Sequence, residues 1–114
     1  MAKHILMAFS NPHPGTDSEF NKWYDEIHLQ EILTVKGYIS AQRFYVSDAQ
    51  MAGRAGPTHK YLTIYEIETD DLEQTLADLN DAARNMSVDP SVDRSTTLAA
   101  VFHPIGERVC GSKT

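Results

Sequence analysis

Residues 4–46 contain the pattern that predicts the fold: HILMAFSNPHPGTDSEFNKWYDEIHLQEILTVKGYISAQRFYV. A short apolar run at residues 4–9 is followed by a segment rich in proline and glycine, which predicts a strand and then a loop. Apolar and aromatic residues then recur at helical spacing as far as about Thr34. Gly37 ends the helical pattern. The aromatic and β-branched side chains of residues 38–46 then predict a second strand.

Each predicted helix begins with a capping-box pattern. In residues 16–19, the Thr16 hydroxyl and the Glu19 carboxylate can each accept a hydrogen bond from an end amide. The same logic predicts Asp70 as the cap of the second helix, with Glu73 as its partner. The second helix has one apolar stripe, formed by Leu72, Leu76, Leu79, Ala83 and Met86.

The second half of the chain repeats the order of the first. Residues 48–58 have no period and contain two glycines and a proline, which predicts a mobile loop and a candidate lid. Strands are expected at residues 59–68 and 95–103, on either side of the second helix and a turn at residues 89–91.

The order strand, helix, strand, strand, helix, strand predicts an α+β, ferredoxin-like βαββαβ fold. Right-handed crossovers then place two helices on one face of a four-stranded antiparallel sheet. We expect a single domain over residues 1–106 and a frayed tail over residues 107–114.

The first and last predicted strands are apolar on both faces. The alternating sets are Ile5, Met7 and Phe9 against Leu6 and Ala8, and Leu98, Ala100 and Phe102 against Ala99 and Val101. An antiparallel sheet with helices on one face should be polar on the other if that face meets water. The pattern therefore predicts a second cover, for which a second copy of the chain is the most economical choice.

Composition excludes several partners. The formal net charge is -6 and the ten Lys and Arg residues are scattered, so we expect neither nucleic acid nor an anionic membrane as a partner. No apolar run approaches the roughly 20 residues that cross a bilayer. The N-terminal residues lack the architecture of a signal peptide, and the single cysteine, Cys110, fits a reducing compartment. We therefore expect a cytoplasmic protein.

The run Glu19–Leu33, followed by Gly37-Tyr38 and by Arg43-Phe44, resembles the EthD-like branch of the dimeric α/β-barrel superfamily. The shared pattern is an aromatic pair and a histidine on the first helix, a glycine, and an arginine followed by an aromatic on the second strand. It covers about the first 45 residues, whereas the second half matches only in its order of elements. Gln30 and Lys36 stand where family members usually have proline.

The resemblance implies a dimeric α/β barrel, in which two sheets pack face to face, and a pocket between the sheet and the helices of each subunit. Similar proteins include cyclases, dehydratases and decarboxylases, heme-degrading or quinone-forming monooxygenases, and accessory proteins of degradation pathways. The fold alone therefore does not select a reaction.

Tyr24 and His28 are the candidate catalytic residues. They are four residues apart and share the helix face that is turned toward the sheet. In an apolar wall a histidine can stay neutral and serve as a general base, and a tyrosine hydroxyl can stabilise a developing oxyanion. The structural alternative is that His28 only satisfies a backbone carbonyl in the core.

Five further residues are candidates for substrate binding: Phe20, Trp23, His4, Tyr65 and Arg43. Core packing is the default interpretation of Phe20 and Trp23, and a packed aromatic with a wet tip is the default interpretation of Tyr65. Arg43 could clamp a carboxylate, but a salt bridge to an acidic residue of the helix (Asp25, Glu26 or Glu31) is an equal alternative.

No metal or cofactor is expected. His28 and Glu31 have a spacing that could share a metal, but no third ligand is marked. The second helix has no histidine to bind a heme iron, and no phosphate-binding loop is present. The leading hypothesis is a cofactor-independent enzyme of the cyclase, dehydratase or lyase type, acting on a carbonyl-bearing aromatic or polyketide-like substrate. The alternatives are a non-catalytic small-molecule-binding accessory protein and a cofactor-free monooxygenase.

Overall fold

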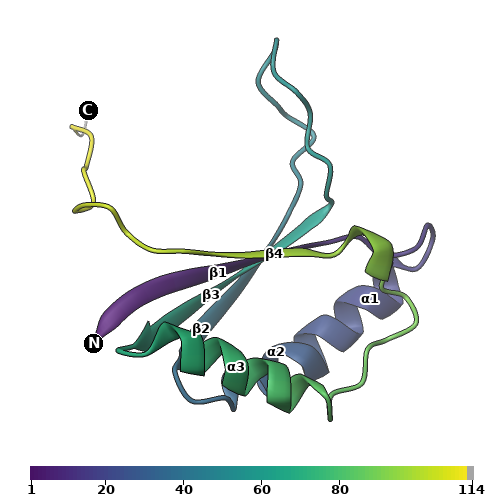
Figure 1. The fold of residues 1–114 in the computed structure, drawn as a ribbon. Helices are drawn as coiled ribbons and strands as arrows, with labels where there is room; N and C mark the ends of the chain where they lie inside the picture. The colour runs from purple at the N-terminus through teal and green to yellow at the C-terminus, as the bar shows by residue number, and fades with distance from the viewer. Residues whose placement is uncertain (113–114) are drawn as a thin grey trace.

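The computed structural model describes residues 1–112 of the chain. Its elements, in order, are β1 (Ala2–Ser10), α1 (Asp17–Trp23), η1 (Tyr24–His28), α2 (Leu29–Leu33), β2 (Tyr38–Tyr45), β3 (Tyr61–Thr69), α3 (Leu72–Ala83), η2 (Arg94–Thr96) and β4 (Leu98–Phe102). The strands form one antiparallel sheet in the order β2-β3-β1-β4, and the helices cover one of its faces (Figure 1). The predicted α+β, ferredoxin-like arrangement is therefore confirmed.

The register of the sheet assigns each strand residue to one face. Leu6 lies opposite Tyr65 of β3 and Val101 of β4, and all three pack in the core beneath the helices. The buried centre of this core also contains Ile32, Tyr38 and Ile67. Because successive side chains of a strand alternate between faces, the odd-numbered residues of β1 lie on the opposite, open face.

The open face is apolar over β1, β4 and the adjoining part of β3, whereas Ser40, Gln42 and Glu66 make its β2 side more polar. Met7 lies between Ile64 and Ala100, and Phe9 lies between Leu62 and Leu98. Leu98 and Phe102 are each 53% exposed, which is unusual for side chains of this size on a sheet. The predicted two-faced apolar pattern is therefore present in the structure.

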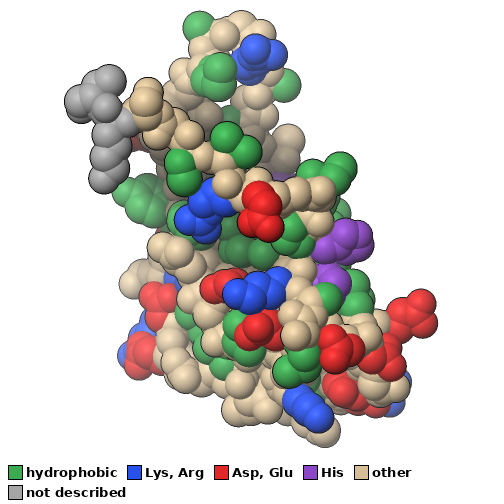
Figure 2. Space-filling view, turned by 90° about the vertical axis from the view of Figure 1, so that its left-hand side faces the viewer, with side chains coloured by type: hydrophobic (Ala, Val, Ile, Leu, Met, Phe, Trp, Pro, Cys, Tyr) green, Lys and Arg blue, Asp and Glu red, His purple; other side chains and the backbone are tan. Residues whose placement is uncertain are grey.

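Two segments project from the sheet on the side of the open face: residues 46–60 between β2 and β3, and the C-terminal segment from residue 103 (Figure 1). In Figure 2, acidic side chains gather over the lower part of the molecule, where the helices lie, and hydrophobic side chains occur along the projecting upper part. None of the helices among residues 1–112 is long and apolar enough to cross a membrane.

The predicted first helix contains a π turn in its middle. Residues 17–33 are continuously helical, but Tyr24–His28 form the wider η1 turn between α1 and α2. Hydrophobic spacing alone predicted a plain α-helix to about Thr34, so the extent is confirmed and the π turn is new. Such turns are rare and occur frequently at functional sites.

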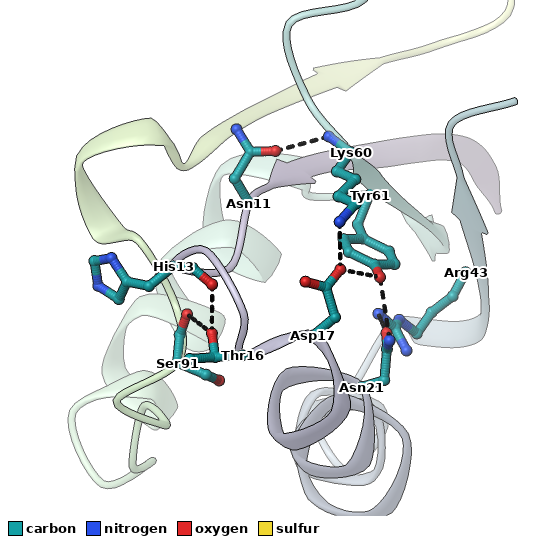
Figure 3. Close-up of polar contacts among 9 residues, drawn as sticks. All are labelled: Asn11, His13, Thr16, Asp17, Asn21, Arg43, Lys60, Tyr61 and Ser91. Carbon is teal, nitrogen blue, oxygen red and sulfur yellow. Dashed lines mark hydrogen bonds and ion pairs between the residues drawn. The ribbon is translucent and has the colours of Figure 1, made fainter. Parts of the chain in front are cut away.

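The capping box predicted at residues 16–19 is wrong. No side chain caps the amides at the start of α1. The Thr16 hydroxyl donates instead to the carbonyl oxygens of His13, at 2.7 Å, and of Ser91, at 3.4 Å (Figure 3). Tertiary contact between the loop after β1 and the segment before β4 has thus replaced the local interaction.

Two other predicted boundaries shift. The cap of α3 is Asp71 rather than Asp70, and its carboxylate accepts a hydrogen bond from the Gln74 amide at 3.1 Å. The helix starts one residue later because β3 extends to Thr69, whose hydroxyl accepts from the Asp71 amide. The last strand begins at Leu98 rather than at residue 95, because Asp93 caps the short η2 turn before it.

Candidate functional site

A cavity of about 390 Å³ lies between the sheet and the helices. Its walls come from β1, the helix at residues 17–33, β3, α3 and the segment that leads into β4. The lining residues are Leu6, Ala8, Phe9, Ser10, Trp23, Tyr24, His28, Ile32, Tyr65, Leu79, Val88, Val92, Arg94 and Thr97. The predicted site residues Trp23, Tyr24, His28 and Tyr65 are thus brought together around one cavity that is large enough for a small organic molecule.

The π turn determines how the rings meet. In an α-helix, residues five apart lie about 140° apart around the axis, so Trp23 and His28 would diverge. The wider turn reduces this angle, and the Trp23 and His28 rings stack with their centroids 4.6 Å apart and an interplanar angle of 20°. Tyr24 meets the same imidazole edge-on, at 4.9 Å and 87°. His28 is therefore held on two sides by aromatic rings.

Burial controls the protonation of His28. Desolvation lowers the pKa of His28 from 6.5 to about 4, so the imidazole is neutral near pH 7. Its Nδ1 is buried and has no hydrogen-bond partner among the described residues. The structural alternative, a histidine that satisfies a backbone carbonyl through Nδ1, therefore does not apply to this atom.

Three other residues that line the cavity each have a buried polar atom without a partner in the described part of the chain: the Tyr65 hydroxyl, the Ser10 hydroxyl and the indole Nε1 of Trp23. Burial raises the pKa of Tyr65, and the neighbouring Tyr24 raises it further, so the hydroxyl keeps its proton. More than nine in ten buried polar groups in proteins are paired. With Nδ1 of His28, four such groups belong to residues around one cavity.

Three predicted substrate-binding residues lie elsewhere. Phe20 is fully buried and packs against the rings of Tyr24, at 5.5 Å, and Tyr61, at 5.0 Å, behind the cavity wall. The ring of His4 lies 5.5 Å from that of His103, and His4 does not line the cavity. Both residues sit on the helix-covered side without reaching His28.

Arg43 forms the salt bridge that was the alternative to binding a substrate carboxylate. Its guanidinium donates to Asp25 at 2.9 Å and to Asn21 at 2.8 Å, and it lies 4.5 Å from the centroid of the Tyr24 ring. The side-chain amide of Asn21 also donates to the Tyr61 hydroxyl, and this hydroxyl donates in turn to the Asp17 carboxylate (Figure 3). Arg43 thus supports Tyr24 from behind the cavity and borders a separate surface hollow.

No pattern in the sequence indicated Ser10, Arg94 or Thr97, which also line the cavity. Ser10 belongs to a turn-like run, and Arg94 and Thr97 lie where a plain strand start was expected. The pattern Asp93-Arg94-Ser95 does predict a side-chain-capped turn, because aspartate bonds readily to the amide two residues on. It does not indicate which way Arg94 points.

Within residues 1–112, no three His, Cys, Asp or Glu side chains come together as a metal site. Glu31, which shares the helix with His28, does not line the cavity. The arrangement around His28 is therefore one of an imidazole, phenol, indole and hydroxyl groups in an apolar wall. Such a set suits proton transfer and hydrogen bonding to an organic molecule.

No protein-family model matches the sequence, and no curated protein matches it. Three solved structures with the same architecture are similar. The heme-degrader MhuD from Mycobacterium tuberculosis, solved with two hemes bound in its active site, is 12% identical, with a TM-score of 0.63 over 93% of this chain and 99% of that chain. An ethyl tert-butyl ether degradation (EthD) family protein from Bacillus halodurans is 10% identical, with a TM-score of 0.56 over 96% and 100%.

The third similar structure is a dimeric ferredoxin-like protein of unknown function from Thermobifida fusca. It is 8% identical, with a TM-score of 0.56 over 90% of this chain and 92% of that chain. At these identities the likeness concerns the fold and not the chemistry. The chain therefore shares the ferredoxin-like fold of these three structures.

Proposed function

We propose that this chain is a cofactor-independent enzyme in which His28 transfers a proton to and from a carbonyl-bearing aromatic or polyketide-like substrate. The observation that carries the proposal is the state of His28: a neutral imidazole, stacked on Trp23, with an unpartnered nitrogen in the wall of a 390 Å³ cavity. A neutral imidazole is a general base, and its conjugate acid can return the proton.

The proposed step removes a proton from the carbon next to a carbonyl group. The proton passes to His28 and the electron pair moves onto the carbonyl oxygen as an enolate. The Tyr65 hydroxyl, buried, protonated and unpaired, supports this step because it can donate to the enolate oxygen. Ring closure onto a second carbonyl, or loss of water, would then take the proton back from the imidazolium.

Tyr24 has a positioning role in this scheme. Its ring packs edge-on against His28 on one side and under the Arg43 guanidinium on the other. Arg43 is fixed in turn by Asp25 and Asn21. This chain of contacts supports a fixed orientation of the imidazole.

We also propose that the working protein is a homodimer joined through the open face of the sheet. The apolar residues of β1, β3 and β4 on that face, together with two segments that project on the same side, support this assembly (Figure 1). Exposed apolar surfaces of this kind mark protein interfaces. The absence of a second cysteine supports a reducing, cytoplasmic setting.

Exchange of the substrate α-proton with solvent tests the enzymatic proposal without knowledge of the product. A panel of aryl ketones and diketones is incubated in D2O and followed by proton NMR. The wild-type protein should accelerate exchange, and His28→Gln should reduce the acceleration by about 100-fold or more. The control is His13→Gln, because His13 is exposed in a loop outside the cavity. Undiminished exchange by a folded His28→Gln variant would contradict the mechanism.

A non-catalytic binding protein would use the same cavity and the same unpaired groups. Binding of a panel compound without any exchange or product would favour that function. A cofactor-free monooxygenase would instead consume oxygen with an electron-rich phenol, which an oxygen electrode measures directly.

A further inference from the structure

We propose that the ligand of this cavity carries a carboxylate or another anionic group, and that Arg94 binds this group at the mouth. The inference rests on the proposed function in one respect, because both use the same cavity. It narrows the substrate class to elongated aromatic carbonyl compounds that are anionic at the end far from the carbonyl.

The cavity has polar groups at two separated positions. Tyr65 lies opposite Leu6 in the sheet, and Ser10 is four residues further along the same face of β1. At about 3.3 Å per residue, these positions are about 13 Å apart. Tyr65 is 2% exposed and Ser10 is 5% exposed, and neither hydroxyl has a partner among the described residues. An elongated ligand with a polar group at each end would satisfy both.

Arg94 lies at the Ser10 end. Phe9 is paired with Leu98, so Thr97 and the η2 turn that contains Arg94 lie beside the end of β1. Both Arg94 and Thr97 line the cavity together with Ser10. Arg94 is exposed and also lines the cavity, so this residue lies where the cavity meets solvent.

The Arg94 guanidinium is free to bind a ligand. It makes no ion pair with the described residues, whereas Arg43 is paired with Asp25 and Arg84 with Asp81. The adjacent acid, Asp93, is engaged otherwise, because its carboxylate accepts from the Ser95 amide at 3.1 Å and from the Ser95 hydroxyl at 2.6 Å. A planar guanidinium that is not already paired can donate two parallel hydrogen bonds to a carboxylate.

The negative net charge of the chain contrasts with the positive charge of Arg94 in the cavity wall. With a formal net charge of -6, the protein as a whole repels anions. Arg94 is the only Arg or Lys side chain in the described cavity wall, and His28 is neutral. A preference for an anionic ligand therefore has to come from Arg94.

Two probes that differ only in charge test the inference. They are 4′-acetylbiphenyl-4-carboxylate and the neutral carboxamide of the same shape. Trp23, the only tryptophan of the chain, lines the cavity, so quenching of its fluorescence measures binding. The wild-type protein should bind the carboxylate about tenfold more tightly than the neutral probe. Arg94→Gln should abolish this preference and leave the affinity for the neutral probe unchanged.

Arg84→Gln is the matched control. Arg84 lies at the C-terminal end of α3, and its Nη1 is 3.5 Å from Oδ1 of Asp81 on the surface. The control variant should keep the full preference, and Arg94→Lys should keep part of it. A carboxylate preference that survives Arg94→Gln would overturn the inference, as would no preference, or no quenching, in the wild-type protein. The proposed proton transfer fails by a different result, undiminished α-proton exchange in His28→Gln, so the two failures are distinguishable.

Discussion

The two faces of the sheet are incomplete in opposite ways. On the helix-covered face, polar atoms of Ser10, Trp23, His28 and Tyr65 are buried without partners around a cavity. On the open face, large apolar side chains such as Phe102 lie exposed without a cover. Unpaired polar groups call for a small polar molecule, and an uncovered apolar sheet calls for another protein surface. On this basis the proposed ligand belongs to one face and the proposed partner subunit to the other.

The largest expected effect concerns the open face. Phe102→Asp places a carboxylate on the surface that would be buried twice in a symmetric dimer, so the dimer should weaken by at least 100-fold. Sedimentation equilibrium measures the change. Ala77→Asp, on the exposed side of α3, is the control and should leave the assembly unchanged. A Phe102→Asp protein that stays dimeric would place the interface elsewhere.

A smaller effect concerns the pH dependence of stability on the helix-covered face. The folded pKa of His28 is about 4, below its ordinary value of 6.5, so the unfolded chain binds more protons between these values. Stability from this residue is therefore fully present above about pH 6.5 and is lost as the pH falls to about 4. The loss should be about 3 kcal/mol.

Urea denaturation of the wild-type protein and of His28→Gln at neutral and acid pH measures this term. The carboxylates with lowered pKa values, Asp17, Asp89 and Asp93, contribute equally to both proteins and cancel in the comparison. The wild-type protein should lose more stability than the variant. Equal losses would show that His28 is not buried as described.

The smallest effect separates two buried tyrosines. The Tyr38 hydroxyl donates to the Thr75 carbonyl at 3.0 Å, so Tyr38→Phe should cost about 1 kcal/mol of unfolding free energy. The Tyr65 hydroxyl has no partner in the described part of the chain, so Tyr65→Phe should leave stability unchanged or slightly raise it. Tyr65→Phe should nevertheless slow α-proton exchange. A stability loss as large as that of Tyr38→Phe would mean that the Tyr65 hydroxyl serves the fold.

Sequence patterns predicted what depends on alternation and spacing. The strand order, the two-faced apolar strands and the placement of Tyr24 and His28 toward the sheet all follow from periods of two and of 3.6 residues. The local capping signal at Thr16 failed because the same hydroxyl bonds to His13 and Ser91. Competition of this kind between local and distant partners is not visible in a short motif.

The cavity itself could not be predicted from one sequence. Its volume is what remains after side chains from five elements have packed, and Arg94 enters only through the direction of a short turn. Phe20, His4 and Arg43 were plausible binding residues by type, but depth in the core and pairing with Asp25 place them outside the cavity wall. Residue type indicates possible chemistry, whereas access depends on the packed structure.

The π turn also resets the rotational phase of the helix. Phe20 and Ile32 are twelve residues apart, which in an unbroken α-helix would set them about 120° apart around the axis. Both are nonetheless buried beneath the same sheet, with exposures of 0% and 5%. If the wider turn absorbs one extra residue, the offset falls to about 20°. Deleting a single residue within Tyr24–His28 would therefore restore the α-helical spacing. Either the aromatic half of the helix or the half that contains Ile32 could then face the sheet, but not both.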